Sequence, residues 1–81
     1  MKLVELTEFL VKSVSKEPDL VSVKQFDDDT DTITIQVLVS EHDMGAVIGS
    51  GGATANAIRT LVQAAAYVSE EKHVRINIDS F

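Results

Sequence analysis

The 81-residue chain contains no cysteine and a single proline. Without cysteine, neither a disulfide framework nor a thiolate-ligated metal site can form. No apolar run approaches the roughly 18 residues that a membrane-spanning helix needs, so we expect no membrane segment. The first residues mix acidic with apolar side chains and lack a secretory signal pattern, which favours a cytoplasmic protein.

Positive charge is also scarce. Seven Lys and Arg residues stand against thirteen Asp and Glu, which gives a net charge of −6. Because phosphate neutralisation supplies most nonspecific affinity for polyanions, this balance argues against such binding. The charge is unevenly placed, however: from Met44 to Ser69 there is no Asp or Glu, and Arg59 is the only charged residue. The overall charge therefore does not exclude a nucleic-acid site in that stretch.

Length and composition indicate one domain over residues 1–81, with a single modest core. Apolar residues from Leu3 to Val14 recur at helical spacing, and we expect Pro18 to end this helix. The alternation over 32–39 predicts a strand, and a weaker pattern over 21–26 predicts a partner strand, joined to it by a polar turn at 27–31.

The second half of the chain predicts two helices and a last strand. Ser40, with Asp43 three residues later, is expected to cap a short helix over 41–48. A longer helix is expected from Ala53 to about Val68, followed by a turn at 70–72 and a strand over 74–78. The resulting order, helix–strand–strand–helix–helix–strand, predicts an α+β fold in which helices pack on one face of a three-stranded mixed sheet. The last strand is expected to run parallel to one strand of the hairpin.

The chain has four glycines: Gly45 lies within the expected short helix, and Gly49, Gly51 and Gly52 lie between it and the longer one. Exposed amides at a helix N-terminus suit an anion, and a GxxG loop joining two helices is the backbone clamp of KH domains, which hold about four nucleotides. The alternative is a glycine-closed helical turn without a ligand. The position after a hairpin and between helices favours the clamp.

Candidate RNA-binding residues follow from that hypothesis. Gly49, Ser50, Gly51 and Gly52 would hold the sugar-phosphate backbone. Val47 and Ile48, with neighbouring strand residues such as Val37 or Val39, would contact bases. Arg59 would either reach a phosphate or form an ordinary surface ion pair, and for Ile58 a place in the core is expected.

Residues 43–52, running into Thr54 and the segment Ala-Ile-Arg-Thr-Leu at 57–61, resemble the small bacterial single-KH proteins of the KhpA type. The similarity covers nearly the whole chain, and its most specific part is Val-Ile-Gly-x-x-Gly with the segment at 57–61. The resemblance implies a type II KH fold that binds single-stranded RNA beside the GxxG loop, as a post-transcriptional regulator or RNA chaperone. It also implies a homodimer, or a heterodimer with a larger KH-containing protein of the KhpB (Jag) type.

One departure from the family pattern concerns Ser50, which stands where these proteins usually carry Lys or Arg. The loss of that cation removes a phosphate contact, which weakens binding and flattens its salt dependence. The rival hypothesis is a protein-interaction module with weak or lost RNA binding, for which the alanine-rich helix from Ala53 offers a packing surface.

No catalytic or metal-binding constellation is predicted, and neither is a cofactor, so we expect no enzyme. The acidic turn at 27–31 lacks the spacing of a calcium loop. His42 and Asp43 are adjacent on a helix and point in different directions. Lys72, His73 and Arg75 are expected to be a solvated edge.

Overall fold

The computed structural model describes residues 2–27, 31–69 and 72–81. Its helices and strands are, in chain order, α1 (Leu3–Val14), β1 (Ser22–Asp27), β2 (Thr32–Val39), α2 (Met44–Ile48), α3 (Ala53–Ser69) and β3 (His73–Ser80). Short 3₁₀ turns precede β1, α2 and α3. The predicted order is confirmed. Residues 28–30 of the turn predicted at 27–31 and residues 70–71 of the turn predicted at 70–72 lie outside the described residues.

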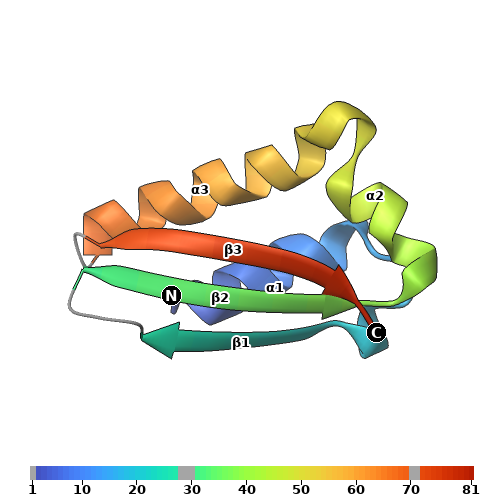
Figure 1. Cartoon of the computed structure of the whole chain (residues 1–81), viewed down its shortest axis with the longest axis horizontal. Helices are drawn as coiled ribbons and strands as arrows, with labels where there is room; N and C mark the ends of the chain where they lie inside the picture. Colours follow the sequence, from blue (N-terminus) through green and yellow to red (C-terminus); the bar gives the residue numbers. More distant parts are fainter. Residues whose placement is uncertain (1, 28–30, 70–71) are drawn as a thin grey trace.

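The sheet has the order β1-β2-β3, and all helices lie on one of its faces (Figure 1). β1 pairs antiparallel with β2, whereas β3 pairs parallel with β2. A parallel pair needs a long crossover, which α2 and α3 provide. This is the three-stranded mixed sheet that the sequence predicts. In the described ranges, no helix is long and apolar enough to cross a membrane.

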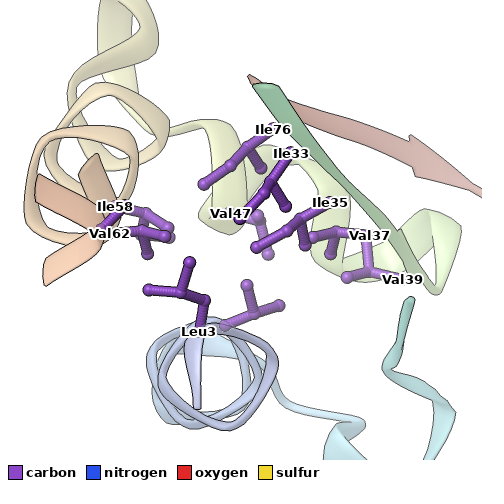
Figure 2. Packing of buried hydrophobic residues seen from close by; sticks show 11 residues of the cluster. Leu3, Ile33, Ile35, Val37, Val39, Val47, Ile58, Val62 and Ile76 are labelled. Atoms are coloured by element: carbon purple, nitrogen blue, oxygen red, sulfur yellow. The ribbon is translucent and has the colours of Figure 1, made fainter. Parts of the chain in front are cut away.

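The core is organised around the covered face of β2. Ile33, Ile35, Val37 and Val39 alternate along this strand and have no exposed surface. Each helix adds apolar side chains to the same cluster (Figure 2). The contributing residues are Leu3 and Val11 of α1, Val47 of α2, and Ile58, Val62 and Ala66 of α3, with Ile76 from β3. The burial of these side chains fixes α2 and α3 against the sheet and so determines where the glycine loop lies.

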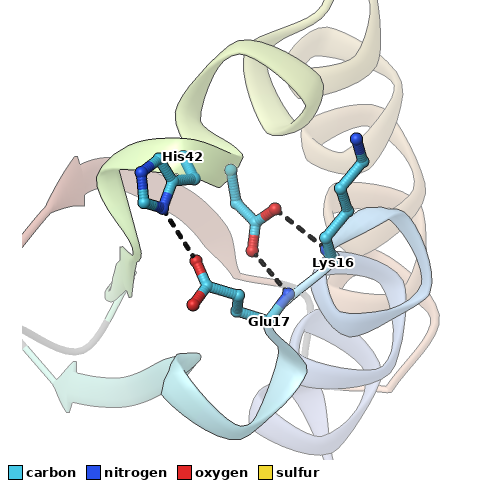
Figure 3. Close-up of polar contacts among 4 residues, drawn as sticks. Lys16, Glu17 and His42 are labelled. Atoms are coloured by element: carbon cyan, nitrogen blue, oxygen red, sulfur yellow. Dashed lines mark hydrogen bonds and ion pairs between the residues drawn. The ribbon is translucent and has the colours of Figure 1, made fainter.

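α1 ends four residues before Pro18, and a buried carboxylate holds the segment between them. The helix stops at Val14, and the backbone N–H groups of Lys16 and Glu17 each donate to the Asp43 carboxylate at 2.9 Å (Figure 3). In a longer helix these amides would donate to carbonyls one turn earlier. Asp43 therefore ties the end of α1 to the start of α2.

The predicted capping role of Ser40 and Asp43 is wrong. The Ser40 side chain makes no cap hydrogen bond, and the Asp43 carboxylate points to the segment after α1. Residues 41–43 form a 3₁₀ turn, and α2 begins only at Met44. The His42 side chain contacts Glu17, with its Nδ1 3.2 Å from Glu17 Oε1.

We expect Asp43→Asn to lower the melting temperature at neutral pH. The N–H of Lys16, and then that of Glu17, holds the pKa of the Asp43 carboxyl below its usual range. A lowered pKa in the folded state stabilises the protein above the unfolded pKa of about 4. That contribution is lost as the pH falls through the folded value.

Thermal unfolding of both proteins from pH 7 down to about pH 2 tests this expectation. The gap between their melting temperatures should be constant near neutrality and close in the acid range. A gap that does not change with pH would show that the carboxylate charge is not what stabilises this junction. Glu17→Gln serves as control, because it changes only the exposed pair with His42.

Candidate nucleic-acid interface

The glycine loop joins α2 to α3 through three residues with positive φ. Gly49, Gly51 and Gly52 have φ values of +79°, +63° and +82°. The Gly49 N–H closes α2 by donating to the Gly45 carbonyl at 2.8 Å. Glycine adopts these angles without the steric cost that other residues pay. The loop can therefore reverse the chain between α2 and α3 within a few residues.

Gly49 and Gly51 differ in what surrounds them. A Cβ on Gly49 would lie 2.7 Å from the Thr54 backbone nitrogen and would collide with Thr54 Oγ1. A Cβ on Gly51 would meet no atom within 4 Å. Gly49 is thus required for the shape of the loop, whereas Gly51 borders open space into which another molecule could approach.

The backbone amides at the tip of the loop are available to a ligand. Ser50 and Gly51 are exposed, and in the described ranges their N–H groups donate to no acceptor. The Ser50 carbonyl is occupied, since it accepts the Ala53 N–H. The loop also leads into the 17-residue α3, whose positive dipole end favours an anion. The arrangement suits a phosphate oxygen at the exposed amides.

The residues predicted to contact bases separate into two groups. Ile48, the last residue of α2, is half-buried and lies directly beside the loop. Val47 has no exposed surface, and neither have Val37 and Val39. These three valines pack in the core, so their predicted place at a groove surface is wrong. Ile58, expected in the core, is buried there.

Arg59 extends from α3 toward the outer edge of β3. Its Nε donates to the Ile76 carbonyl at 3.4 Å, and its Nη1 donates to Asn56 Oδ1 at 3.3 Å. In the part of the chain that the structure describes, no carboxylate forms an ion pair with Arg59. The ion-pair alternative is therefore not observed, and the guanidinium charge remains uncompensated there.

The groove between α3 and β3 contains a cavity of about 480 Å³. Its lining includes Arg59, Gln63, His73 and Arg75. His73 and Arg75 are exposed on the edge strand, as predicted, and lie beside Arg59. The proximity of His73 and Arg75 to Arg59 could not be predicted from the alternation of residues along the strand. It depends on β3 being an edge strand beside α3, which only the sheet order decides.

Comparison with known proteins places this geometry in a family. The family model described as "KhpA/KhpB, KH domain" matches residues 4–78. Two proteins named "RNA-binding protein KhpA", from Clostridium perfringens and Caldanaerobacter subterraneus, are each 42% identical over 74 residues, which cover 91% of this chain and 96% of theirs. A third of the same name, from Borreliella burgdorferi, is 41% identical over 78% of this chain and 76% of its own.

Among solved structures, the chain is similar to Era, crystallised with MgGDPNP and a segment of 16S ribosomal RNA, with a TM-score of 0.68 and 16% identity. The match covers 96% of this chain but 29% of that one, so it supports the fold alone. The family model and the KhpA relatives extend over most of the sequence, including the GxxG loop. The chain therefore belongs to the KhpA/KhpB family of KH domains.

Proposed function

We propose that this protein binds single-stranded RNA, without catalysis, by holding the sugar-phosphate backbone on its GxxG loop. The observation that carries the proposal is the pair of exposed amides at Ser50 and Gly51, which have no acceptor among the described residues. The name "RNA-binding protein", printed for relatives that align with nearly the whole chain, supports RNA as the ligand.

The path of the RNA follows from the surroundings of the loop. A phosphate would lie against the backbone of residues 49–52, and the following bases would turn toward α3 and β3. Ile48 offers a half-buried apolar surface at the start of this path, and Arg59 offers a charge further along it. Val47 supports the loop from within the core. Unpaired bases suit such a groove because their faces and edges are accessible.

The biological role that fits this binding is post-transcriptional regulation or RNA chaperoning in the cytoplasm. The rival, an interaction module with lost RNA binding, rests on low basicity and Ser50. It is less well supported, because the loop amides do not depend on a side-chain cation and the relatives are named for RNA binding. No cofactor is needed for the proposed role.

Titration of a labelled single-stranded RNA, and of the same sequence as a duplex, tests this function. We expect saturable binding of the single strand, weak dependence on salt, and little binding of the duplex. Equal affinity for both forms, or none for either, would contradict the proposal. A fluorescence-anisotropy series at several salt concentrations provides the measurement.

Restoring a cation in the loop should strengthen binding. We expect Ser50→Lys to raise the affinity at low salt and to steepen the slope of log K against log salt by about 0.7, the value for one added phosphate contact on a single strand. Ser50→Gln is the matched control, since it adds length without charge. An unchanged slope in the Lys variant would place the RNA phosphate away from this loop.

We further propose that the outer face of α3 carries a protein contact, either with a second copy or with a larger KH-containing protein of the KhpB type. Ala57, Leu61, Ala64 and Val68 follow one another at helical spacing and are all exposed, Val68 at 90%. No charged residue interrupts this face. An uncharged stripe of this kind is typical of a helix that packs against another one.

Leu61→Glu should disrupt such a contact. The introduced carboxylate would be buried without a partner in a dimer but fully hydrated in a monomer. We expect a dimer-to-monomer shift in light scattering, with the melting temperature of the monomeric domain little changed because Leu61 is 53% exposed. Leu61→Met, which keeps the surface apolar, is the control. A wild-type protein that is monomeric at high concentration would restrict this face to a heterodimer.

A further inference from the structure

At the end of the α3/β3 groove far from the glycine loop, two exposed rings form a corner. Tyr67, near the end of α3, is 50% exposed, and His73 opens β3 and is also exposed. Their ring centroids are 5.6 Å apart at an interplanar angle of 75°, and Tyr67 Oη lies 3.2 Å from His73 Nδ1. Two nearly perpendicular rings can offer a face to one side of a planar ligand and an edge to its rim.

The backbone around this corner is held in place by one side chain. The Gln63 amide accepts the Val74 N–H through Oε1 at 2.9 Å and donates through Nε2 to the Lys72 carbonyl at 2.9 Å. This pair of bonds ties the start of β3 to the middle of α3. The backbone on either side of His73 is therefore fixed against α3 before any ligand binds, which reduces the entropic cost of binding.

Positive charge borders the corner on the side of the groove. The 480 Å³ cavity there is lined by residues that include His73, Arg75 and Arg59, and no acidic side chain is among the described residues that line it. Binding sites for single-stranded nucleic acid combine aromatic rings with cationic side chains, because the bases stack on the rings and the cations attract the phosphates.

The distance from the loop decides which part of an RNA could reach this corner. Ala53 and Tyr67 begin and nearly end α3, and at 1.5 Å per residue they are about 21 Å apart along the axis. A stacked strand has one phosphate per roughly 3.4 Å, so this length corresponds to about six nucleotides. A KH clamp holds about four. The corner thus lies beyond the clamp, where the strand leaves it.

We infer that Tyr67 and His73 form a base-stacking subsite for an RNA strand that extends past the GxxG loop along α3 and β3, with Arg75 beside it. The inference rests on the proposed RNA binding and adds to it a longer footprint and named residues. Base–aromatic stacking contributes enough for removal of the Tyr67 ring to weaken binding of a long strand roughly tenfold.

Tyrosine fluorescence reports directly on this subsite. Tyr67 is the only tyrosine of the chain, and there is no tryptophan. Single-stranded oligoadenylates and oligouridylates of about four and about eight nucleotides would be titrated while the emission of Tyr67 is followed. We expect quenching by the longer oligomers only, because the shorter ones fill the clamp without reaching the corner.

Two variants separate this inference from RNA binding in general. Tyr67→Leu should lower affinity for the longer oligomers about tenfold and leave that for the shorter ones unchanged. Tyr67→Phe, which keeps the ring, should bind as the wild type does. If the longer oligomers bind without quenching and Tyr67→Leu binds them normally, the subsite is wrong while RNA binding stands. If no oligomer of either length or sequence binds, both proposals fail.

Discussion

Replacing Ser50 and Gly51 by aspartate should weaken RNA binding by at least about thirtyfold while leaving the fold intact. Both side chains would project from the exposed tip of the loop, where a Cβ on Gly51 meets nothing. Gly51 has φ +63° and ψ 18°, a left-handed conformation that Asp and Asn tolerate better than other residues. The substitution therefore changes the charge of the loop more than its shape.

The size of the effect follows from Coulomb's law. A carboxylate about 4 Å from a phosphate costs about 1 kcal/mol in water and more near a protein surface. Two carboxylates should then weaken binding by at least about 2 kcal/mol, or roughly thirtyfold. Titration of a single-stranded RNA against this variant, with circular dichroism to check the fold, provides the measurement.

The matched control is the double variant with Asn at both positions. Its side chains have nearly the same size and the same tolerance for the left-handed conformation, but no charge. We expect it to retain most of the RNA affinity. If the Asp and Asn pairs lose affinity equally, loop shape and not charge controls binding. If neither loses affinity, the RNA does not lie on this loop.

Gly49→Ala should cause the largest loss of stability among the loop substitutions. Gly49 combines φ +79° with ψ 172°, a region that is essentially restricted to glycine and costs other residues roughly 1–3 kcal/mol. In addition, the new methyl group would collide with Thr54 at the start of α3. We expect a loss of about 2–4 kcal/mol in the free energy of unfolding, measured by urea denaturation, and loss of RNA binding with it.

Gly51→Ala is the comparison for this prediction. Its Cβ would occupy open space, so only the cost of the left-handed conformation, roughly 1 kcal/mol, should appear. The account therefore predicts a clear difference between alanine at Gly49 and alanine at Gly51. Equal losses in the two variants would contradict the close approach of Gly49 to Thr54.

The parts of the fold that the sequence predicts well are those with a long, regular pattern. The alternation of Ile33, Ile35, Val37 and Val39 predicts β2 and its buried face, because each second residue of a strand points to the same side. The glycine loop is equally recognisable, because its GxxG pattern falls between two segments that are predicted to be helices. Both features are local, and both are as predicted.

Contacts between residues that are far apart in the sequence cannot be predicted from local sequence patterns. The carboxylate of Asp43, 27 positions away from Lys16, accepts the amides that follow α1. Nothing near Val14 signals that acceptor. The local signal, Pro18, predicts the non-helical conformation of Glu17, whereas the helix already ends at Val14.

The predicted contacts of Val47 and Ile48 show a second limit. α2 has five residues, too few for hydrophobic periodicity to separate an inward from an outward side chain. The structure buries Val47 completely and leaves Ile48 partly accessible beside the loop.

The most direct test of RNA binding on the glycine loop is to follow the backbone amide resonances of the isotopically labelled protein during titration with a single-stranded RNA. The account predicts the largest shifts at Ser50, Gly51 and Gly52, smaller ones at Ile48 and Arg59, and none along β1. Shifts concentrated on the open face of the sheet, with the loop amides unmoved, would contradict it.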